Sequence, residues 1–221
     1  MTNDMPLNAT TSSSLEVEVE LKYLLRQPTS MALTNAASSH TISQCYFHPS
    51  ITEFHVDIAN FRICLSKIEL HFEASEKQKR TLVAILDQTP NPTIRLRQMD
   101  ENWYFTVKGL SMDEGTLEFE VGISEGQGLE LVAHSYQSLE KVRHLVLEDA
   151  YLWEVDVYSG KLDGLVVAEL ENRNYTAFPP RVLPAWIGLD VTKDSQYKNS
   201  CLAALSAVGV EALLMEHTIH P

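Results

Sequence analysis

LEVEVELK, at residues 15–22, alternates apolar with charged side chains at every position. Successive side chains of a β-strand point to opposite faces of the sheet, so residues two apart share a face. Glu18, Glu20 and Lys22 therefore project together, and the apolar residues between them project the other way. This stretch, continued to residue 25, predicts a strand with one charged face and one apolar face.

The same period of two returns along most of the chain. It predicts seven further strands, at residues 41–47, 93–99, 103–109, 116–123, 139–147, 151–158 and 164–171. Short strands joined mostly by tight turns are typical of an antiparallel sheet or a closed barrel. The fold class is therefore predicted to be mainly β (α+β), with a few flanking helices.

Helical patterns are fewer. Residues 128–138 carry a weak helical pattern, and residues 195–216 carry a stronger one with a leucine and small-residue stripe. Residues 48–92 fit no strand of the regular series and are predicted to be an insertion, with a hairpin at 61–65 and 68–72 and a helix at 76–87. We expect residues 1–14 to form a disordered tail and residues 15–221 to form a single domain.

Composition excludes several classes of function. The net charge of −13 argues against a nucleic-acid-binding surface and an anionic-membrane surface. No apolar stretch approaches the roughly 20 residues that span a bilayer, and residues 1–14 lack the apolar core of a secretory signal. The three cysteines are widely spaced and odd in number, which favours a reducing cytoplasm over a disulfide framework.

Charged pairs of a single sign share a strand face throughout the predicted sheet. The pairs are Glu18 with Glu20, Arg95 with Arg97, Glu118 with Glu120, Lys141 with Arg143, and Glu169 with Glu171. Any one pair is ordinarily a solvated face, but an ordinary wet surface mixes signs and uncharged polar residues. If the sheet closes with these faces inward, its lumen suits a polyanion bridged by divalent cations. The sequence contains no GxxxxGK[ST], GxGxxG, HExxH or GxSxG motif.

The ordered set of motifs resembles the CYTH domains, also called triphosphate tunnel metalloenzymes. Glu18-Val19-Glu20-Leu21-Lys22 matches their ExExK signature. The match continues in order through Gln44-Cys45-Tyr46-Phe47, Arg95-Leu96-Arg97, Lys108, Glu118-Phe119-Glu120, Lys141-Val142-Arg143, Trp153-Glu154-Val155-Asp156, Glu169-Leu170-Glu171 and Tyr197-Lys198-Asn199. It covers residues 16–204 apart from 48–92, and it looks most like the small bacterial inorganic triphosphatases. The fold that it implies is a closed, eight-stranded antiparallel β-barrel tunnel.

The resemblance also implies a division of roles. Lys22, Arg95, Arg97, Lys108 and Arg143 are expected to bind the phosphates. Glu18, Glu20, Glu118, Glu120, Glu169 and Glu171 are expected to hold Mg²⁺ or Mn²⁺. Lys141, with Tyr46, is the candidate for the base or for positioning the attacking water, because a lysine among other cations can have a lowered pKa.

The expected reaction is metal-dependent hydrolysis of inorganic tripolyphosphate to diphosphate and phosphate. The alternatives are a class IV adenylate cyclase, a thiamine or nucleoside triphosphatase, and a non-enzymatic polyphosphate-binding module. A homodimer is compatible with the sequence. Relatives often carry an Arg just before the carboxylate pair that Glu118 and Glu120 match, where this chain has Thr116 and Leu117. That departure, with the insertion at 48–92, puts one phosphate contact and access to the tunnel in doubt.

Overall fold

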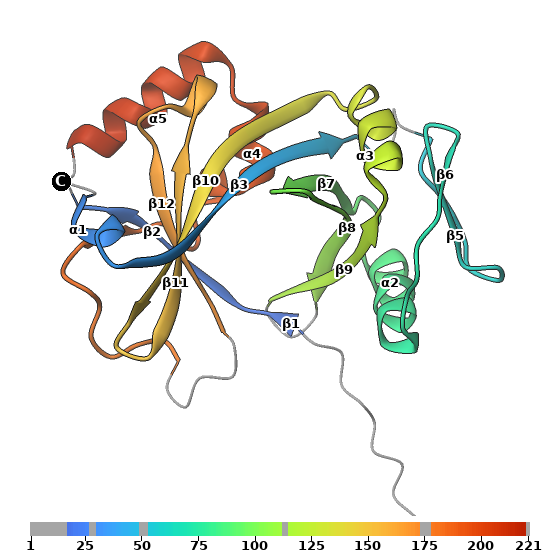
Figure 1. The fold of residues 1–221 in the computed structure, drawn as a ribbon, viewed down its shortest axis with the longest axis horizontal. Coiled ribbons are helices and arrows are strands. Elements are labelled where there is room, and N and C mark those ends of the chain that lie inside the picture. The colour runs from blue at the N-terminus through green and yellow to red at the C-terminus, as the bar shows by residue number, and fades with distance from the viewer. Residues whose placement is uncertain (1–16, 27–29, 49–52, 112–114, 173–177, 220–221) are drawn as a thin grey trace, which may run out of the picture.

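The computed structural model describes residues 17–26, 30–48, 53–111, 115–172 and 178–219. The expected tail at residues 1–14 lies outside these ranges. Most of the described chain forms one antiparallel sheet, with helices packed against its outer side (Figure 1). The mainly β fold class is therefore confirmed.

The main sheet has ten strands. They are β1 (Val17–Glu18), β2 (Glu20–Leu25), β3 (Ala36–Phe47), β7 (Thr93–Met99), β8 (Asn102–Ser111), β9 (Gly115–Ile123), β10 (Gln137–Glu148), β11 (Tyr151–Tyr158), β12 (Val166–Glu171) and β13 (Ile187–Asp190). Their order is β1-β9-β8-β7-β3-β10-β11-β12-β2-β13. The long strands β3 and β10 run side by side across the molecule and join its two halves (Figure 1).

The main sheet has more strands than the predicted eight, for two physical reasons. The strand expected at residues 15–25 is interrupted at Val19, which divides it into β1 and β2. β1 pairs with β9, whereas β2 pairs with β12, so the two pieces lie near opposite ends of the strand order. The second reason is β13, a four-residue strand after the proline-rich segment, which pairs with β2 and is too short for its alternation to stand out in the sequence.

Residues 53–92 form a separate layer. A three-stranded sheet of β4 (His55–Asp57), β5 (Arg62–Leu65) and β6 (Ile68–Leu70) precedes helix α2 (Glu76–Gln88). The predicted hairpin and helix are therefore present. Ile63, Leu65, Leu82 and Ile85 are buried in one hydrophobic cluster with residues of β7, β8 and β9. The layer thus covers the outer, apolar face of those strands, as inward-facing charges require.

The other helices differ from the prediction. The helix expected at residues 128–138 is α3 (Glu125–Val132), because Ser124 and Gln127 form a capping box that starts it earlier. β10 already begins at Gln137. Gly128 sits where a Cβ atom would lie 2.3 Å from the ring of Trp103, so a larger residue would push this helix off the sheet.

The helix expected at residues 195–216 is divided. It comprises the short 3-10 turn η2 (Ser195–Tyr197), α4 (Asn199–Ala204) and α5 (Ala207–Ile219). The described helices also include α1 (Ser30–Leu33) and the turn η1 (Gly160–Leu162). Leu202, Ala203, Val210 and Leu213 bury the apolar side of α4 and α5 against Tyr158 and its neighbours. Within the described ranges, no helix combines the length and the apolar character needed to cross a bilayer.

Candidate active site

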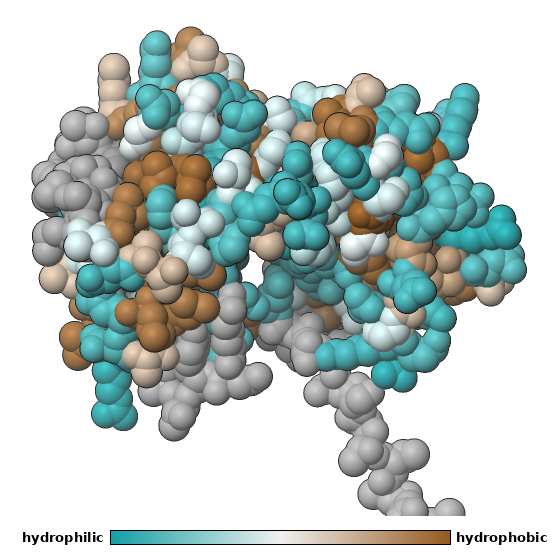
Figure 2. Space-filling view, in the orientation of Figure 1, coloured by the Kyte–Doolittle hydropathy of each residue, from teal (hydrophilic) through white to brown (hydrophobic). Residues whose placement is uncertain are grey.

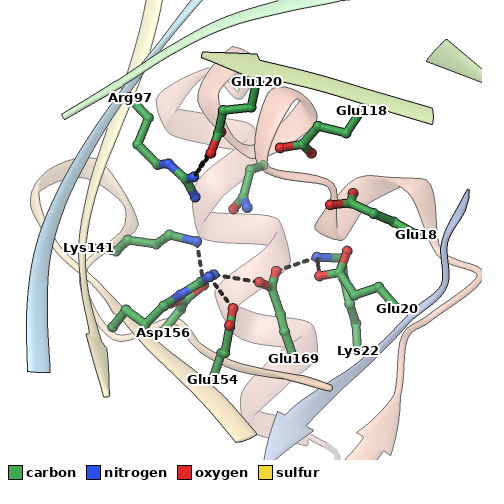
Figure 3. A network of polar contacts seen from close by, with 12 residues as sticks. Glu18, Glu20, Lys22, Arg97, Glu118, Glu120, Lys141, Glu154, Asp156 and Glu169 are labelled. Carbon is green, nitrogen blue, oxygen red and sulfur yellow. Dashed lines mark hydrogen bonds and ion pairs between the residues drawn. The ribbon is translucent and has the colours of Figure 1, made fainter. Parts of the chain in front are cut away.

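The inward faces of the main sheet line a cavity of about 400 Å³. All six predicted metal-binding glutamates and all five predicted phosphate-binding cations line it. Side chains from strands far apart in the sequence point toward one another around its centre (Figure 3). The space-filling view shows hydrophilic residues around the opening between the two halves of the molecule (Figure 2). The structure therefore brings the predicted lining residues together.

The strand registers explain why these residues meet. Glu169 of β12 lies opposite Lys22 of β2, and Lys108 of β8 lies opposite Glu118 of β9. A side-chain period of two keeps residues 20 and 22, or 118 and 120, on the same inward face. The intervening residues Phe119 and Leu170 are fully buried on the outer side. One alternation thus produces both the charged cavity and the apolar outer core.

One side of the cavity, which we call the buried wall, comprises Lys22, Lys141, Arg143, Glu154, Asp156 and Glu169. Arg143 donates to both carboxylate oxygens of Asp156 at 2.7 Å, to Glu169 at 2.6 Å, and also to Glu154. Lys22 donates to Glu20 at 2.7 Å and to Glu169. Burial alone would raise the pKa of Glu169, but Lys22, Lys141 and Arg143 together hold that pKa well below its usual value. Each charge of this wall therefore has a partner of opposite sign.

The other side, which we call the open wall, comprises Glu18, Arg95, Arg97, Lys108, Glu118 and Glu120. Glu120 accepts from Arg95 at 3.0 Å, from Arg97 at 2.8 and 2.9 Å, and from the Thr106 hydroxyl at 2.8 Å. Lys108 contacts both Glu18, at 2.9 Å, and Glu118. The side chains of Glu18 and Lys108 are 33% and 26% exposed, which leaves this wall accessible from the cavity.

Two carboxyls of the open wall have pKa values shifted in opposite directions. Burial raises the pKa of Glu18 to about 7. The positive charge of Lys108 lowers this pKa, and the negative charge of Glu118 raises it, so burial has the larger effect. Burial would raise the pKa of Glu118 as well, but Arg95 and Lys108 outweigh it and lower that pKa to about 2. The negative charge of Glu118 is therefore stabilised by its neighbouring cations. The negative charge of Glu18 is not stabilised enough to offset the cost of its burial.

The predicted catalytic residues Lys141 and Tyr46 lie in the wall rather than on the cavity surface. The ammonium of Lys141 is fully buried, pairs with Asp156, and lies 5.4 Å from the ring centre of Tyr158. Burial lowers the pKa of Lys141. The Tyr46 hydroxyl donates to Gln44 at 3.1 Å, and burial raises its pKa well above the usual value. Tyr46 is thus a neutral hydrogen-bonding residue beside the site.

Sequence reasoning missed several members of the site. Glu154 and Asp156 follow the same two-residue spacing as the chosen pairs, so the signal was present, and their register opposite Leu145 and Arg143 places them in the wall. Gln44, His40 and Asn199 also line the cavity. The ring of His40 is fixed by Asp100, 2.7 Å away. Gln44 and Asn199 lie within the matched motifs, which could have marked them, whereas nothing in the local pattern marks His40.

The donor set fits a hard divalent cation. Carboxylate oxygens are the ligands that Mg²⁺ and Mn²⁺ prefer. Burial raises the pKa of Glu20 as well as that of Glu18, so two cavity carboxylates lack enough positive charge to balance them. Among the described residues, no three acidic, His or Cys side chains already converge as a metal centre. Lys22 and Lys108 instead lie against the carboxylates that would do so.

Comparison with known proteins gives two similar sequences. An inorganic triphosphatase of Acetivibrio thermocellus is 36% identical over 112 residues, which are 50% of this chain and 70% of that protein. An inorganic triphosphatase of Nitrosomonas europaea is 35% identical over 121 residues, which are 52% of this chain and 78% of that protein. No family model matches the chain.

A solved structure supports the same grouping at the level of the fold. The crystal structure of an inorganic triphosphatase aligns with a TM-score of 0.51 and 23% identity, over 86% of this chain and 97% of the other. At this identity the structural similarity shows a shared fold, while the two relatives of higher sequence identity show a shared family. With its ordered motifs gathered around one cavity, this chain belongs to the CYTH family of triphosphatases, the triphosphate tunnel metalloenzymes.

Proposed function

We propose that this protein hydrolyses inorganic tripolyphosphate to diphosphate and phosphate with the help of Mg²⁺ or Mn²⁺. The observation that carries the proposal is the cavity in which cations and carboxylates from both walls face one another. A phosphate chain needs cations for its oxygens, and carboxylates beside them suit the metal ions that accompany the chain. A module that only bound an anion would have no use for six glutamates.

We also infer that the main sheet is closed into a tunnel through its first strand. β1 pairs with β9 at one end of the strand order, and β2 pairs with β12 near the other end. Only Val19 separates the two pieces, so the chain itself joins the ends. Counted as one strand, β1 and β2 give a ring of eight with β13 added outside β2. Such a ring favours a substrate that is surrounded on all sides.

Each group of residues has a role in this proposal. Arg95, Arg97 and Lys108 of the open wall, with Lys22 and Arg143 opposite, hold the phosphate oxygens. The glutamates of the three same-face pairs would hold the metal ions, which would neutralise the phosphate chain and lower the pKa of water. Lys141 lies behind the cavity surface, and burial lowers its pKa; in its neutral form it takes the proton, through one bridging water, as a second water attacks the terminal phosphorus. The bond to the bridging oxygen breaks, and diphosphate leaves.

The composition of the lining supports the inorganic substrate over ATP and thiamine triphosphate. Among the described residues that line the cavity there is no Phe, Tyr or Trp on which a base or a thiazolium ring would stack. The adenylate cyclase and the organic triphosphatases therefore remain alternatives with less support. The three free cysteines, Cys45, Cys64 and Cys201, are compatible with the predicted cytoplasmic location.

The test is a comparison of substrates. Phosphate release is measured from tripolyphosphate, ATP and thiamine triphosphate, each with Mg²⁺ and with Mn²⁺, in parallel with an assay for cyclic AMP. We expect the highest kcat/KM with tripolyphosphate. Efficient formation of cyclic AMP, with little phosphate released from tripolyphosphate, would replace the proposed function with that of a cyclase.

A further inference from the structure

Helix α2, in the layer formed by residues 53–92, contacts the tunnel wall at both of its ends. Near its first turn, the side-chain amide of Gln78 donates to the backbone carbonyl of Glu120 at 2.7 Å. At its C-terminal end, the hydroxyl of the capping residue Thr89 accepts from the backbone N–H of Leu110 at 3.1 Å. Both contacts are made beside cavity residues, since Leu110 follows Lys108 by two positions. Figure 1 shows α2 beside β8 and β9.

The packing between these two contacts is close. A Cβ atom at Gly109 would lie 2.5 Å from the Thr89 hydroxyl and 2.7 Å from a methyl group of Ile85. Leu82 and Ile85 of α2 are fully buried in the same cluster as Phe105 and Phe119. Between its two contacts with the wall, the helix is therefore packed closely against β8 and β9.

Glu120 is a central residue of the open wall. Its carboxylate accepts hydrogen bonds from Arg95, Arg97 and Thr106, so its direction sets the positions of two cations that face the cavity. A backbone shift at residue 120 moves all three partners. Outer contacts that orient a metal-binding or substrate-binding group typically change affinity or activity 10- to 100-fold when they are removed.

We propose that Gln78 is a positioning residue for the active site, which holds Glu120 and through it Arg95 and Arg97 in place for the triphosphate. The inference rests on the proposed function, and it gives the layer of residues 53–92 a part in that function. Gln78 does not touch the substrate. It acts through the peptide group of Glu120.

The chain offers a matched control. Gln78 and Gln127 occupy the same position in two capping boxes, with Ser75 at the start of α2 and Ser124 at the start of α3. The side-chain amide of Gln127 instead approaches the backbone at the end of the small sheet. It lies 3.5 Å from the carbonyl of Glu69 and, with its oxygen and nitrogen exchanged, hydrogen-bonds the backbone N–H and carbonyl of His71. Both glutamines therefore contact the serine that caps their helix, and of the two only Gln78 contacts the cavity wall.

The experiment separates the two roles of Gln78. Gln78→Glu keeps oxygen atoms for the capping box but loses the N–H donor to Glu120. Gln78→Lys keeps a donor but loses the capping oxygen. Gln127→Glu is the control. For each variant we would measure kcat and KM with tripolyphosphate, the Kd of tripolyphosphate by calorimetry, and the urea midpoint of unfolding.

We expect Q78E to lower kcat/KM about 10- to 100-fold and to weaken tripolyphosphate binding, with a urea midpoint close to that of Q127E. Q78K should keep more activity than Q78E despite a lower midpoint, and Q127E should stay within about twofold of wild type. Wild-type affinity and activity in Q78E would overturn the proposal. If Q78E does not fold, Gln78→Met takes its place in the comparison with Q78K, and loss of the folded state in both would make Gln78 a purely structural residue.

The two hypotheses fail in different ways. A wild-type protein that releases no phosphate from tripolyphosphate would disprove the proposed function. The calorimetric Kd would still test the positioning role, because it does not depend on turnover. Equal Kd values for Q78E and Q127E would then reject that role independently.

Discussion

The two walls of the cavity contain the same kinds of residue in different environments. In the buried wall, the side chains of Lys141 and Asp156 are completely inaccessible to solvent, and Arg143 is 13% exposed. In the open wall, Glu18, Lys108 and Glu120 are 25 to 33% exposed. A buried charge that loses its partner costs far more than an exposed one. The buried wall is therefore expected to contribute more to the stability of the fold than the open wall does.

The largest expected effect is a difference in kinetics between variants of Lys141 and Arg143, two neighbouring residues of the buried wall. Lys141→Ala should lower kcat about 10²- to 10⁴-fold if Lys141 accepts the proton. Arg143→Ala should mainly raise KM, by about 10- to 100-fold, because the arginine forks onto oxygens without exchanging protons. Steady-state kinetics with tripolyphosphate measure both.

The pH–rate profile adds a second readout to this pair. Burial lowers the pKa of Lys141, so a base at this position makes the wild-type rate rise as the pH increases through that pKa. Lys141→Ala should lose this rise, and Arg143→Ala should keep it. If both variants only raise KM and keep the wild-type profile, Lys141 is another phosphate contact.

The next effect compares the stability of the two walls. Asp156→Asn removes the negative charge that faces both Lys141 and Arg143 in the interior, and it should lower the free energy of unfolding by about 3–5 kcal/mol. Lys108→Ala, in the open wall, should lower it by no more than about 1 kcal/mol. Urea denaturation at pH 7 measures both. Similar losses in the two variants would mean that the walls do not differ in the way their exposure indicates.

The smallest effect concerns Glu18 in the metal-free protein. Its pKa is about 7 in the folded state and 4.5 for the free group, so ionisation removes stability as the pH rises between these values. Glu18→Gln should therefore be more stable than wild type by about 1 kcal/mol at pH 8, after allowance for the partial exposure of the side chain. The difference should vanish near pH 4.5. Urea titrations in excess chelator at both pH values test this, and a variant less stable than wild type at pH 8 would refute it.

Local alternation allowed the inward faces to be predicted from sequence. Glu118 and Glu120 line the cavity, and Phe119 packs outside, as the period of two requires. Asp156 shows the limit of that reasoning. Its spacing from Glu154 gave the same signal, but only the pairing of β10 with β11 reveals that it faces Lys141 and Arg143.

The differences between the predicted and the observed elements also arise from contacts between residues distant in the sequence. Gly126 and Gly128 weaken the helical pattern of α3, while the close contact of Gly128 with Trp103 that explains this glycine is made in three dimensions. Val19 continues a perfect alternation, so the break between β1 and β2 arises from where their partner strands lie. The contact of Gln78 with Glu120 joins residues 42 positions apart and has no local signal.

The central claim is that carboxylates and cations of this cavity act together through a divalent cation on a phosphate chain. The most direct measurement is phosphate release from tripolyphosphate by the full chain, first with Mg²⁺ or Mn²⁺ and then in excess chelator, with metal added back at the end. The seven glutamates lining the cavity would repel a bare polyphosphate, so we predict turnover with metal, none with chelator, and recovery on addition of metal. Full activity in excess chelator would contradict this mechanism.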